Sequence, residues 1–465
     1  MTLIKSISGI RGTIGGQSGV NLTPIDIVKF ASAFGSWINQ SNAKHRKKIA
    51  VGRDARLSGN MLSSLVCNSL TALGIDVIDL GLSTTPTVEM AVVELQCQGG
   101  IILTASHNPK QWNALKLLNS KGEFISEAEG SLIIEYAQNE NFTFSDVNNL
   151  GNITKRDDLL DFHISKILAL PYVDKQAVKD ANFKIVVDAV NSVGGFAVPR
   201  LLAELGITQI EKLFCEPTGE FAHNPEPLPE NLLELSSAVK KHKANLGISV
   251  DPDVDRLALV CEDGEMFGEE YTLVTVSDYV LSLKLGNTVS NLSSSRALQD
   301  VTEKHGAKHF SSAVGEVNVV KLMKETEAVI GGEGNGGIIL PELHYGRDAL
   351  VGIAIFLTQL AKSKKTCSVL RSSYPNYFIS KNKIELTKET DVDFIISKIQ
   401  SKYHKQPLNT IDGLKIEFDK EWVHLRKSNT EPIIRIYAES KLEITADNLA
   451  KKIINDIKEI IKETR

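Results

Sequence analysis

Short apolar runs alternate with amphipathic stretches from the start of the chain. Residues 49–51, 77–80 and 101–103 are mainly apolar and end at polar or glycine positions, a pattern typical of buried strands. Residues 24–38 follow a threonine, begin with proline and repeat apolar side chains every three or four positions, which predicts a helix. The alternation predicts a parallel or mixed sheet covered by helices.

The alternation continues in two further blocks. The second block has a strand, a helix and another strand, at residues 184–188, 198–205 and 246–250. The third has a strand, a loop and a glycine-rich turn, at residues 288–292, 311–316 and 331–337. This recurrence predicts repeated α/β domains, although no residue-level repeat is evident.

The last block has a different pattern. Residues 414–418 and 433–438 are strand-like, and the chain closes with a helix whose Leu449, Ile453 and Ile457 share one face. These elements predict a smaller α+β domain. A polar stretch at residues 138–158 predicts a boundary between the first and second blocks.

Composition limits the possible functions. With 465 residues the chain is too long for one core, and about three or four domains are expected. The net charge of -5 gives no electrostatic signature of nucleic-acid binding. Five cysteines lack C-x-x-C spacing, so we expect neither a disulfide framework nor a zinc site. No segment approaches the roughly 20 apolar residues of a membrane span, and the chain is expected in a reducing cytoplasm.

The loop at residues 104–109, Thr-Ala-Ser-His-Asn-Pro, follows the apolar run at 101–103. Ser106 in this loop is the candidate nucleophile. No G-x-S-x-G motif surrounds it, so we expect the serine to carry a phosphate group rather than to attack an acyl group. An ordinary polar turn after a strand explains the same residues, and other loops must decide between the two interpretations.

Three aspartates at alternate positions give a stronger chemical signal. Asp251, Asp253 and Asp255 follow the strand predicted at 246–250, and such spacing can place three carboxylates around one hard cation. An EF-hand is excluded, because Arg256 stands where the EF-hand requires glycine and a hydrophobic strand follows. A solvated acidic turn is the alternative to a metal site.

Three further loops have residues suited to binding phosphate or sugar groups. Residues 9–12, Gly-Ile-Arg-Gly, place Arg11 between glycines, where it can approach an anion. Residues 331–337 are rich in glycine and include Glu333 and Asn335, which can hydrogen-bond hydroxyl groups; a flexible turn is the alternative. Residues 426–435 combine basic and hydroxyl side chains that suit a phosphate monoester, whereas a polar hairpin turn would need fewer donors.

Taken together, the serine, aspartate, glycine-rich and arginine loops resemble the α-D-phosphohexomutase superfamily. The resemblance runs from the Arg11 loop to the loop at 428–432, with all four signature loops in family order. It implies three related α/β domains and a C-terminal α+β domain like the TATA-binding protein, around a central cleft. The implied domains cover residues 1–152, 153–257, 258–371 and 372–465.

The resemblance also implies roles for individual residues. Ser106 would be a phosphoserine and, with Asp251, Asp253 and Asp255, would bind one Mg²⁺ per active site. Lys116 would assist proton transfer, and Arg11 and His107 complete the catalytic set. The substrate would be held by Arg256, Glu333, Asn335, Arg426, Ser428, Asn429, Thr430 and Arg435.

Three departures from the family pattern concern Ser8, Ala114 and the sugar loop. Ser8 replaces a common Asp, Ala114 replaces a common Gly, and the sugar loop reads Gly-Glu-Gly-Asn-Gly-Gly instead of the common Gly-Glu-x-Ser-Gly-His. This form of the loop resembles an archaeal-type subgroup assigned as phosphoglucosamine mutases. The resemblance therefore implies exchange of glucosamine 6-phosphate and glucosamine 1-phosphate through a 1,6-bisphosphate.

Other functions fit the same residues. A glucose or mannose phosphate mutase is the first alternative, because changes in hydroxyl contacts give modest discrimination. A phosphatase and a catalytically silent sugar-phosphate-binding protein are further alternatives. Intact Ser106, Lys116 and the three aspartates argue against a silent protein. The expected partner is a small-molecule hexose or hexosamine phosphate, with no nucleic acid or membrane, and the sequence predicts no oligomeric state.

Overall fold

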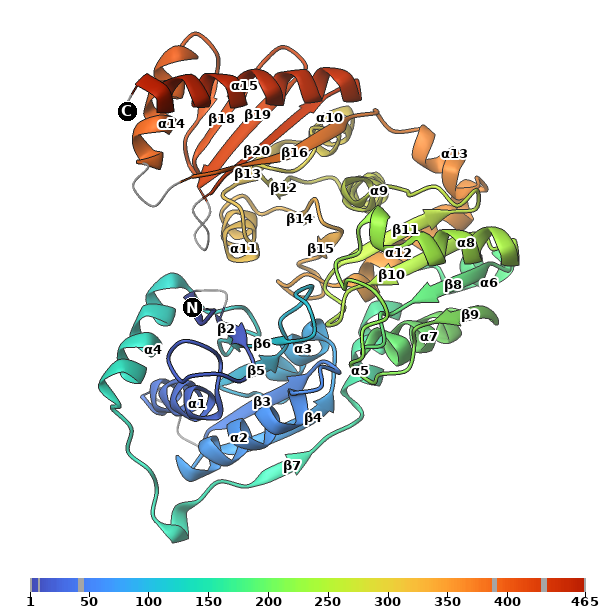
Figure 1. The fold of residues 1–465 in the computed structure, drawn as a ribbon. Helices are drawn as coiled ribbons and strands as arrows, with labels where there is room; N and C mark the ends of the chain where they lie inside the picture. The colour runs from blue at the N-terminus through green and yellow to red at the C-terminus, as the bar shows by residue number, and fades with distance from the viewer. Residues whose placement is uncertain (1, 7–8, 41–45, 387–390, 428–432, 464–465) are drawn as a thin grey trace. The chain divides into compact units, whose positions relative to one another are not determined.

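The structure is a computed structural model that describes every residue except 1, 7–8, 41–45, 387–390, 428–432 and 464–465. The chain divides into two compact units (Figure 1). The first contains residues 1–283 and 335–371, and the second contains residues 284–334 and 372–465.

The first sheet has seven strands in the order β1-β2-β6-β5-β3-β4-β7. The strands are β1 (Ile4–Ser6), β2 (Gly9–Thr13), β3 (Lys48–Arg53), β4 (Asp76–Leu82), β5 (Gly99–Leu103), β6 (Trp112–Leu118) and β7 (Ile153–Lys155). The pairs β3/β4, β3/β5 and β4/β7 are parallel, and the pairs β5/β6, β2/β6 and β1/β2 are antiparallel. The expected mixed sheet is confirmed.

Helices cover both faces of this sheet. They are α1 (Pro24–Asn39), α2 (Gly59–Ala72), α3 (Thr85–Glu94) and α4 (Glu127–Asn139). Ile49 and Val51 of β3 lie in a core with α1, α2 and α4, whereas Ala50 lies in the core with α3. This division follows from the two-residue period of a strand. The polar stretch after α4 contains β7, which extends the first sheet beside β4.

The second sheet has the order β11-β10-β8-β9. Its strands are β8 (Lys184–Asp188), β9 (Gln209–Leu213), β10 (Leu246–Val250) and β11 (Leu257–Cys261). The helices of this region are α5 (Leu159–Leu168), α6 (Lys175–Ala181), α7 (Gly194–Glu204) and α8 (Leu233–His242), of which α7 and α8 contact the sheet. β11 is antiparallel to β10, so the short connection between them carries the aspartate loop.

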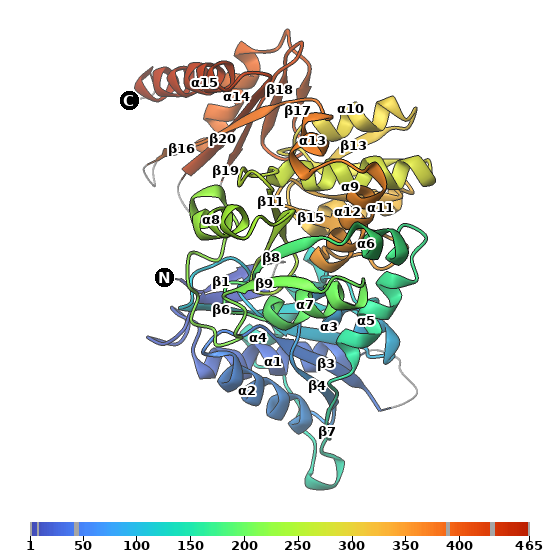
Figure 2. The ribbon, with the colours of Figure 1, turned by 90° about the vertical axis from the view of Figure 1, so that its right-hand side faces the viewer.

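Later segments complete the first unit. They are α9 (Glu269–Leu283), β15 (Gly337–Ile339), α12 (Ala349–Ser363) and most of α13 (Cys367–Ser372). α12 packs against α5, α6, α7 and α9, and Figure 2 shows it among these helices. It is apolar on nearly all sides from Ala349 to Leu360, as expected for a buried helix.

The second unit contains strands β13, β12 and β14 side by side and parallel. Its first elements are β12 (Thr288–Asn291), α10 (Ala297–Lys304), β13 (His309–Ser312), α11 (Glu316–Glu325) and β14 (Ile330–Glu333). The loop expected at 311–316 was wrong at its ends, because β13 includes Ser311 and Ser312 and α11 starts at Glu316. Pairing with β12 explains this strand, and the local sequence does not reveal that pairing.

The last sheet is antiparallel throughout, in the order β16-β20-β19-β18-β17. Its elements are β16 (Phe378–Glu385), α14 (Val392–Lys402), β17 (Leu408–Asn409), β18 (Leu414–Glu417), β19 (Trp422–Lys427), β20 (Ile433–Ser440) and α15 (Glu443–Glu463). α15 packs on β16 and β20 and lies along one face of the sheet (Figure 1). The expected α+β domain is confirmed, whereas the exact domain boundaries stay predictions.

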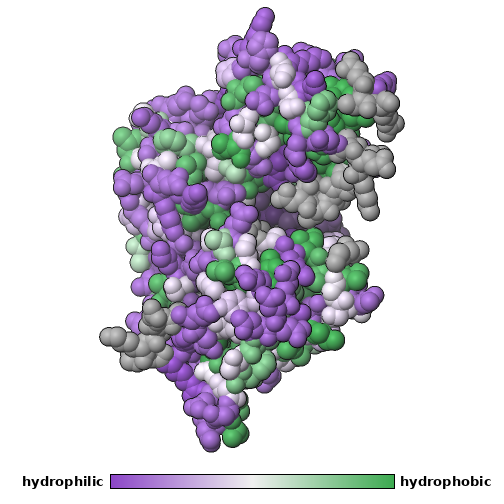
Figure 3. All heavy atoms as spheres, turned by 90° about the vertical axis from the view of Figure 1, so that its left-hand side faces the viewer, coloured by the Kyte–Doolittle hydropathy of each residue, from purple (hydrophilic) through white to green (hydrophobic). Residues whose placement is uncertain are grey.

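Hydrophilic and hydrophobic side chains are interspersed on the face drawn in Figure 3. Among the described residues, no helix is both long enough and apolar enough to cross a membrane. The five cysteines, Cys67, Cys97, Cys215, Cys261 and Cys367, are free.

Candidate active site

Ser106 lies in the loop that follows β5, the strand whose five residues are all buried. Its φ of 50° is in the left-handed region, and its N–H donates to Thr104 Oγ1 at 2.9 Å. The serine is 4% exposed, and its Oγ donates to Asp251 Oδ2 at 2.9 Å. The loop therefore turns the candidate nucleophile toward the aspartates.

A buried arginine holds this loop in place. The Arg56 guanidinium donates hydrogen bonds to four main-chain carbonyls around the serine, those of Ser106, Asn108, Pro109 and Trp112. Arg56 also pairs with Asp54 at 3.0 Å, and both side chains are fully buried. Asp54 accepts a further hydrogen bond from the Thr104 hydroxyl at 2.7 Å. A charged pair in the core thus fixes the backbone on which Ser106 is mounted.

The three aspartates lie between β10 and β11, and all are fully buried. Carboxylate oxygens of Asp251, Asp253 and Asp255 lie within 4.8 Å of one another. Asp251 Oδ1 accepts the main-chain N–H groups of Asp255 and Arg256, both at 3.1 Å. These bonds close the loop so that its carboxylates converge.

Two cations and a hydroxyl compensate part of this negative charge. Lys116 Nζ of β6 lies 2.7 Å from Asp253 Oδ2 and 3.4 Å from Asp255 Oδ2. Arg347 Nη2 donates to Asp255 Oδ2 at 2.6 Å, and the Thr85 hydroxyl of α3 donates to Asp253 Oδ2 at 2.6 Å. Donors from three separate elements therefore converge on the loop.

The pKa values follow from this arrangement. Burial, together with the charges of Asp255 and Asp253, raises the pKa of Asp251 well above its usual range. Burial also acts to raise the pKa of Asp255, but Arg347 and Lys116 outweigh it and the net pKa is lowered. Burial acts to lower the pKa of Lys116, but Asp253 and Asp255 outweigh it, so the pKa is raised and the amine is charged.

The donor set fits a magnesium ion. Among the described residues, none hydrogen-bonds to Asp253 Oδ1 or Asp255 Oδ1, although both atoms are buried. Buried carboxylate oxygens are normally paired, and convergent carboxylates are the ligands that Mg²⁺ prefers. Ser106 Oγ, hydrogen-bonded to Asp251, adds a fourth oxygen to the same group.

The structure places three other expected residues around this centre. Arg11 of β2 donates to Asn108 Oδ1 at 2.9 Å, within the serine loop. His107 Nδ1 lies 3.3 Å from Ser106 Oγ, and burial together with Arg256 and Arg11 holds the His107 pKa well below its usual range. Arg256 Nη1 approaches Glu226 at 3.5 Å. His107 is therefore neutral at the serine.

The residues expected to contact the sugar fall in different units. Glu333 ends β14 in the second unit, where its Oε1 accepts from Asn291 at 3.0 Å and from the Gly315 N–H at 3.2 Å. Asn335 lies in the first unit, and its Oδ1 accepts the Gly337 N–H at 3.2 Å.

Glycine is required in this turn. Gly336 has a φ of 79°, and a Cβ there would lie 2.0 Å from Leu257 O. A Cβ on Gly337 would lie 2.4 Å from Cδ of Arg347. The turn therefore packs against the start of β11 and against the arginine that holds Asp255.

Arg426 of β19 and Arg435 of β20 are directly opposed partners in the antiparallel register. Directly opposed residues share a face of the sheet, and two like charges there repel unless an anion or acid lies nearby. Arg426 approaches Asp412 at 3.8 Å. Ser428, Asn429 and Thr430, and also Ser8, lie outside the described residues, so their expected roles stay predictions.

The sequence analysis missed the roles of Arg56, Asp54, Thr85 and Arg347. The charged run after β3, which contains Asp54 and Arg56, was the available signal, because charges next to a buried strand require partners. Arg347 is 92 positions from Asp255 and follows no recognisable pattern. Only the fold brings it to the aspartates.

Comparison with known proteins establishes the family. Sequence models of phosphoglucomutase/phosphomannomutase α/β/α domains I, II and III match residues 3–144, 161–264 and 268–377, and the model of the C-terminal domain matches residues 383–456. The chain belongs to the phosphoglucomutase/phosphomannomutase family. It has the four-domain fold of that family and is a phosphohexomutase.

Individual relatives match over nearly the whole chain. A phosphoglucomutase/phosphomannomutase of Thermococcus kodakarensis is 35% identical, with 97% of this chain and 99% of the relative covered. A phosphoglucosamine/phosphogalactosamine mutase of Sulfurisphaera tokodaii is 31% identical, with 98% of each covered. The crystal structure of a Burkholderia thailandensis family protein aligns with a TM-score of 0.83 at 26% identity and covers 98% of each chain.

We predict that Arg56→Met destabilises the protein and lowers kcat, because it removes the support of the serine loop and leaves Asp54 buried without its cation. The expected loss is about 3–5 kcal/mol of unfolding free energy, measured by denaturant titration. Arg156→Met is the control, since Arg156 pairs with Asp158 at the surface, and no measurable change in unfolding free energy is expected.

The double variant Asp54→Asn/Arg56→Met separates stability from catalysis. It should regain part of the lost stability, because the unpaired charge is gone, while kcat stays low because the loop carbonyls still lack their donor. Wild-type kcat in Arg56→Met would contradict a role for this arginine in placing Ser106.

Proposed function

We propose that the protein interconverts glucosamine 6-phosphate and glucosamine 1-phosphate through a phosphoserine at Ser106 and a 1,6-bisphosphate intermediate. The observation that carries the proposal is the hydrogen bond from Ser106 Oγ to Asp251 within a buried group of three aspartates. A serine in this position suits phosphoryl transfer, in which positioning and charge stabilisation supply most of the catalysis.

In the proposed reaction the bond between Ser106 Oγ and phosphorus breaks as a sugar hydroxyl attacks. The serine oxygen must then gain a proton, and the sugar hydroxyl must lose one. Lys116, whose pKa is raised, holds a proton within the aspartate group. His107 is neutral 3.3 Å from Ser106 Oγ and can accept the serine proton in the second transfer, when Ser106 attacks the bisphosphate. The bisphosphate then turns over and returns its other phosphate to the serine.

Asp251, Asp253 and Asp255, with the serine phosphate, would hold Mg²⁺, which when bound offsets charge on the transferred phosphoryl oxygens. Arg11, beside Asn108, and Arg256, beside Glu226, would bind the reacting phosphate. Arg426 and Arg435 would bind the phosphate that does not react, with Ser428, Asn429 and Thr430 as further donors. Glu333 and Asn335 would contact the sugar.

The choice of glucosamine rests on the sugar loop and on relatives. Relatives at about 31% identity from Methanopyrus kandleri and Pyrococcus horikoshii are named probable phosphoglucosamine mutases. A 2-ammonium group on the sugar would donate a charge-assisted hydrogen bond to a carboxylate such as Glu333. The Thermococcus relative, named for glucose and mannose phosphates, favours the second candidate. The free cysteines fit a reducing cytoplasm.

Sugar identity is tested by kcat/KM for glucosamine 6-phosphate, glucose 1-phosphate and mannose 1-phosphate with one preparation of phosphorylated enzyme. We expect the highest value for glucosamine 6-phosphate. A preference for glucose or mannose phosphate would overturn the substrate assignment and leave the mutase class intact. Release of inorganic phosphate as the main product would instead indicate a phosphatase.

We predict that active protein carries phosphate on Ser106, detectable by intact-mass and peptide mass spectrometry. Ser106→Ala should have no mutase activity, since the group to be transferred has no attachment point. Ser120→Ala, at an exposed serine after β6, is the matched control and should keep full activity. Full wild-type activity without serine phosphate and without added bisphosphate would refute the phosphoserine cycle.

For the distal phosphate, Arg426→Ala should raise KM and lower kcat together, by about 10- to 100-fold in kcat/KM, because charge-assisted hydrogen bonds are lost in both complexes. The neighbouring Lys427→Ala is the control, since Lys427 alternates to the other face of β19 and approaches Asp393 there. The loss at Arg426 should be similar for every hexose phosphate. A loss of kcat/KM confined to one sugar would show that this arginine contacts the sugar and not the phosphate.

A further inference from the structure

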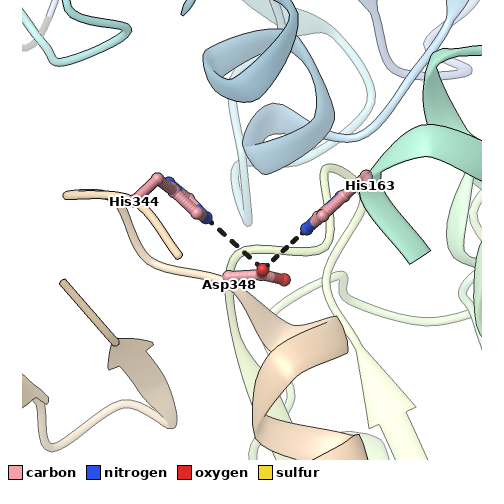
Figure 4. A group of neighbouring side chains, drawn as sticks. All are labelled: His163, His344 and Asp348. Carbon is pink, nitrogen blue, oxygen red and sulfur yellow. Dashed lines mark hydrogen bonds and ion pairs between the residues drawn. The ribbon is translucent and has the colours of Figure 1, made fainter. Parts of the chain in front are cut away.

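A second group of metal-ligating side chains lies in the first unit, apart from the aspartate loop. His163 of α5, His344 of the loop before α12 and Asp348, which caps α12, meet there (Figure 4). His163 Nε2 lies 2.9 Å from Asp348 Oδ2, and His344 Nε2 lies 3.4 Å from the same oxygen. Figure 4 shows both imidazole rings pointing at the Asp348 carboxylate.

The spacing of these atoms matches a tetrahedral metal site. With metal–ligand bonds of about 2.0 Å, neighbouring ligand atoms of a tetrahedron lie about 3.3 Å apart. The two measured distances, 2.9 and 3.4 Å, bracket that value. All three ligand atoms lie within 4.8 Å of one another. One small ion can therefore reach all of them with little movement.

The remote nitrogens of both histidines face oxygen atoms of α3. His163 Nδ1 is hydrogen-bonded to Thr87 Oγ1 at 3.0 Å, and His344 Nδ1 lies at ion-pair distance, 3.2 Å, from Glu89 Oε2. Metal-binding histidines usually donate their second N–H to a carboxylate or another oxygen, which fixes the tautomer. With those protons on Nδ1, both Nε2 lone pairs face Asp348.

Asp348 is also oriented for binding. Its Oδ1 accepts the N–H groups of Leu350 and Val351 at 2.8 and 3.3 Å, so its Oδ2 faces the histidines. A cavity of about 740 Å³ is lined by His344 and by Met90, Phe162, Lys166, Leu343 and Tyr345. His163 and Asp348 are fully buried and lie outside the lining of this cavity, so His344 is the ligand through which the cavity adjoins the site.

We propose that His163, His344 and Asp348 bind a divalent transition-metal ion of the Zn²⁺ class. Two imidazoles and one carboxylate suit zinc, whereas magnesium prefers oxygen ligands alone. The ion would tie α5 to the N-terminus of α12. Arg347, the partner of Asp255, immediately precedes Asp348. The site would thus anchor the segment that supports the aspartate loop.

Without a metal ion, hydrogen bonds and ion pairs hold His163, His344 and Asp348 together. Burial acts to lower the pKa of His344, but hydrogen bonds to Asp348 and Glu89 outweigh it and raise the pKa to about 10. An ion-pair cluster without metal is therefore the competing explanation. Metal binding differs from such an ion-pair cluster because the ion must displace a proton from His344.

The test is a Co²⁺ titration of chelator-stripped, full-length protein in excess Mg²⁺, which occupies the aspartate loop. Four-coordinate Co²⁺ with nitrogen ligands absorbs visible light strongly, whereas octahedral Co²⁺ on oxygen ligands absorbs weakly. We expect one equivalent of strongly absorbing Co²⁺, displaced by Zn²⁺, and a higher thermal unfolding midpoint with Zn²⁺. Wild-type protein without the strong band would overturn the proposal.

Matched variants assign the band. His344→Gln and His163→Gln should each lose the strongly absorbing equivalent and the thermal shift with Zn²⁺, whereas His404→Gln, at an exposed histidine after α14, should keep both. Because both histidine variants are made, the test still works if one of them fails to fold. An unchanged band in a folded His344→Gln or His163→Gln variant would overturn the assignment. The readout does not involve sugar turnover, so it is independent of the proposed substrate.

Discussion

Burial of three carboxylates at one loop is the constraint on which the first unit depends. Asp251, Asp253 and Asp255 are fully buried, and such charges are tolerated only with partners. The partners come from distant parts of the chain. Lys116 lies on β6, and Arg347 immediately precedes Asp348, the N-cap of α12. The packing that brings these elements together is therefore also what makes the aspartate loop stable.

The same loop couples to the serine through one hydrogen bond, from Ser106 Oγ to Asp251 Oδ2. That bond requires the serine loop to keep its left-handed turn, and Arg56 provides this by binding the surrounding carbonyls. Arg56 in turn needs Asp54 as its buried counter-charge. Catalytic geometry and core stability are thus linked, because a change at either member of the ion pair affects both.

The sequence predicted the parts of the site that depend on local pattern. The strand before Ser106 and the strand before Asp251 were predicted from apolar runs that end in polar residues, and the structure confirms both strands. Contacts between distant segments could not be predicted from the sequence, because nothing around Arg347 signals a partner 92 positions earlier. The short strand β7 was missed for a similar reason, because pairing with β4 supports it, while all three of its residues are exposed.

Charge balance connects the two halves of the proposed mechanism. In the first unit the three aspartates face Lys116 and Arg347, with Arg256 4.0 Å from Asp255. Burial, together with the charges of Asp255 and Asp253, raises the pKa of Asp251. A divalent cation would stabilise the charged form of these carboxylates. In the second unit Arg426 and Arg435 are directly opposed across β19 and β20, and Arg426 approaches Asp412 at 3.8 Å. In the proposed mechanism the opposed arginines would bind a phosphate dianion by charge-assisted hydrogen bonds, and Mg²⁺ would offset the charge of the aspartates.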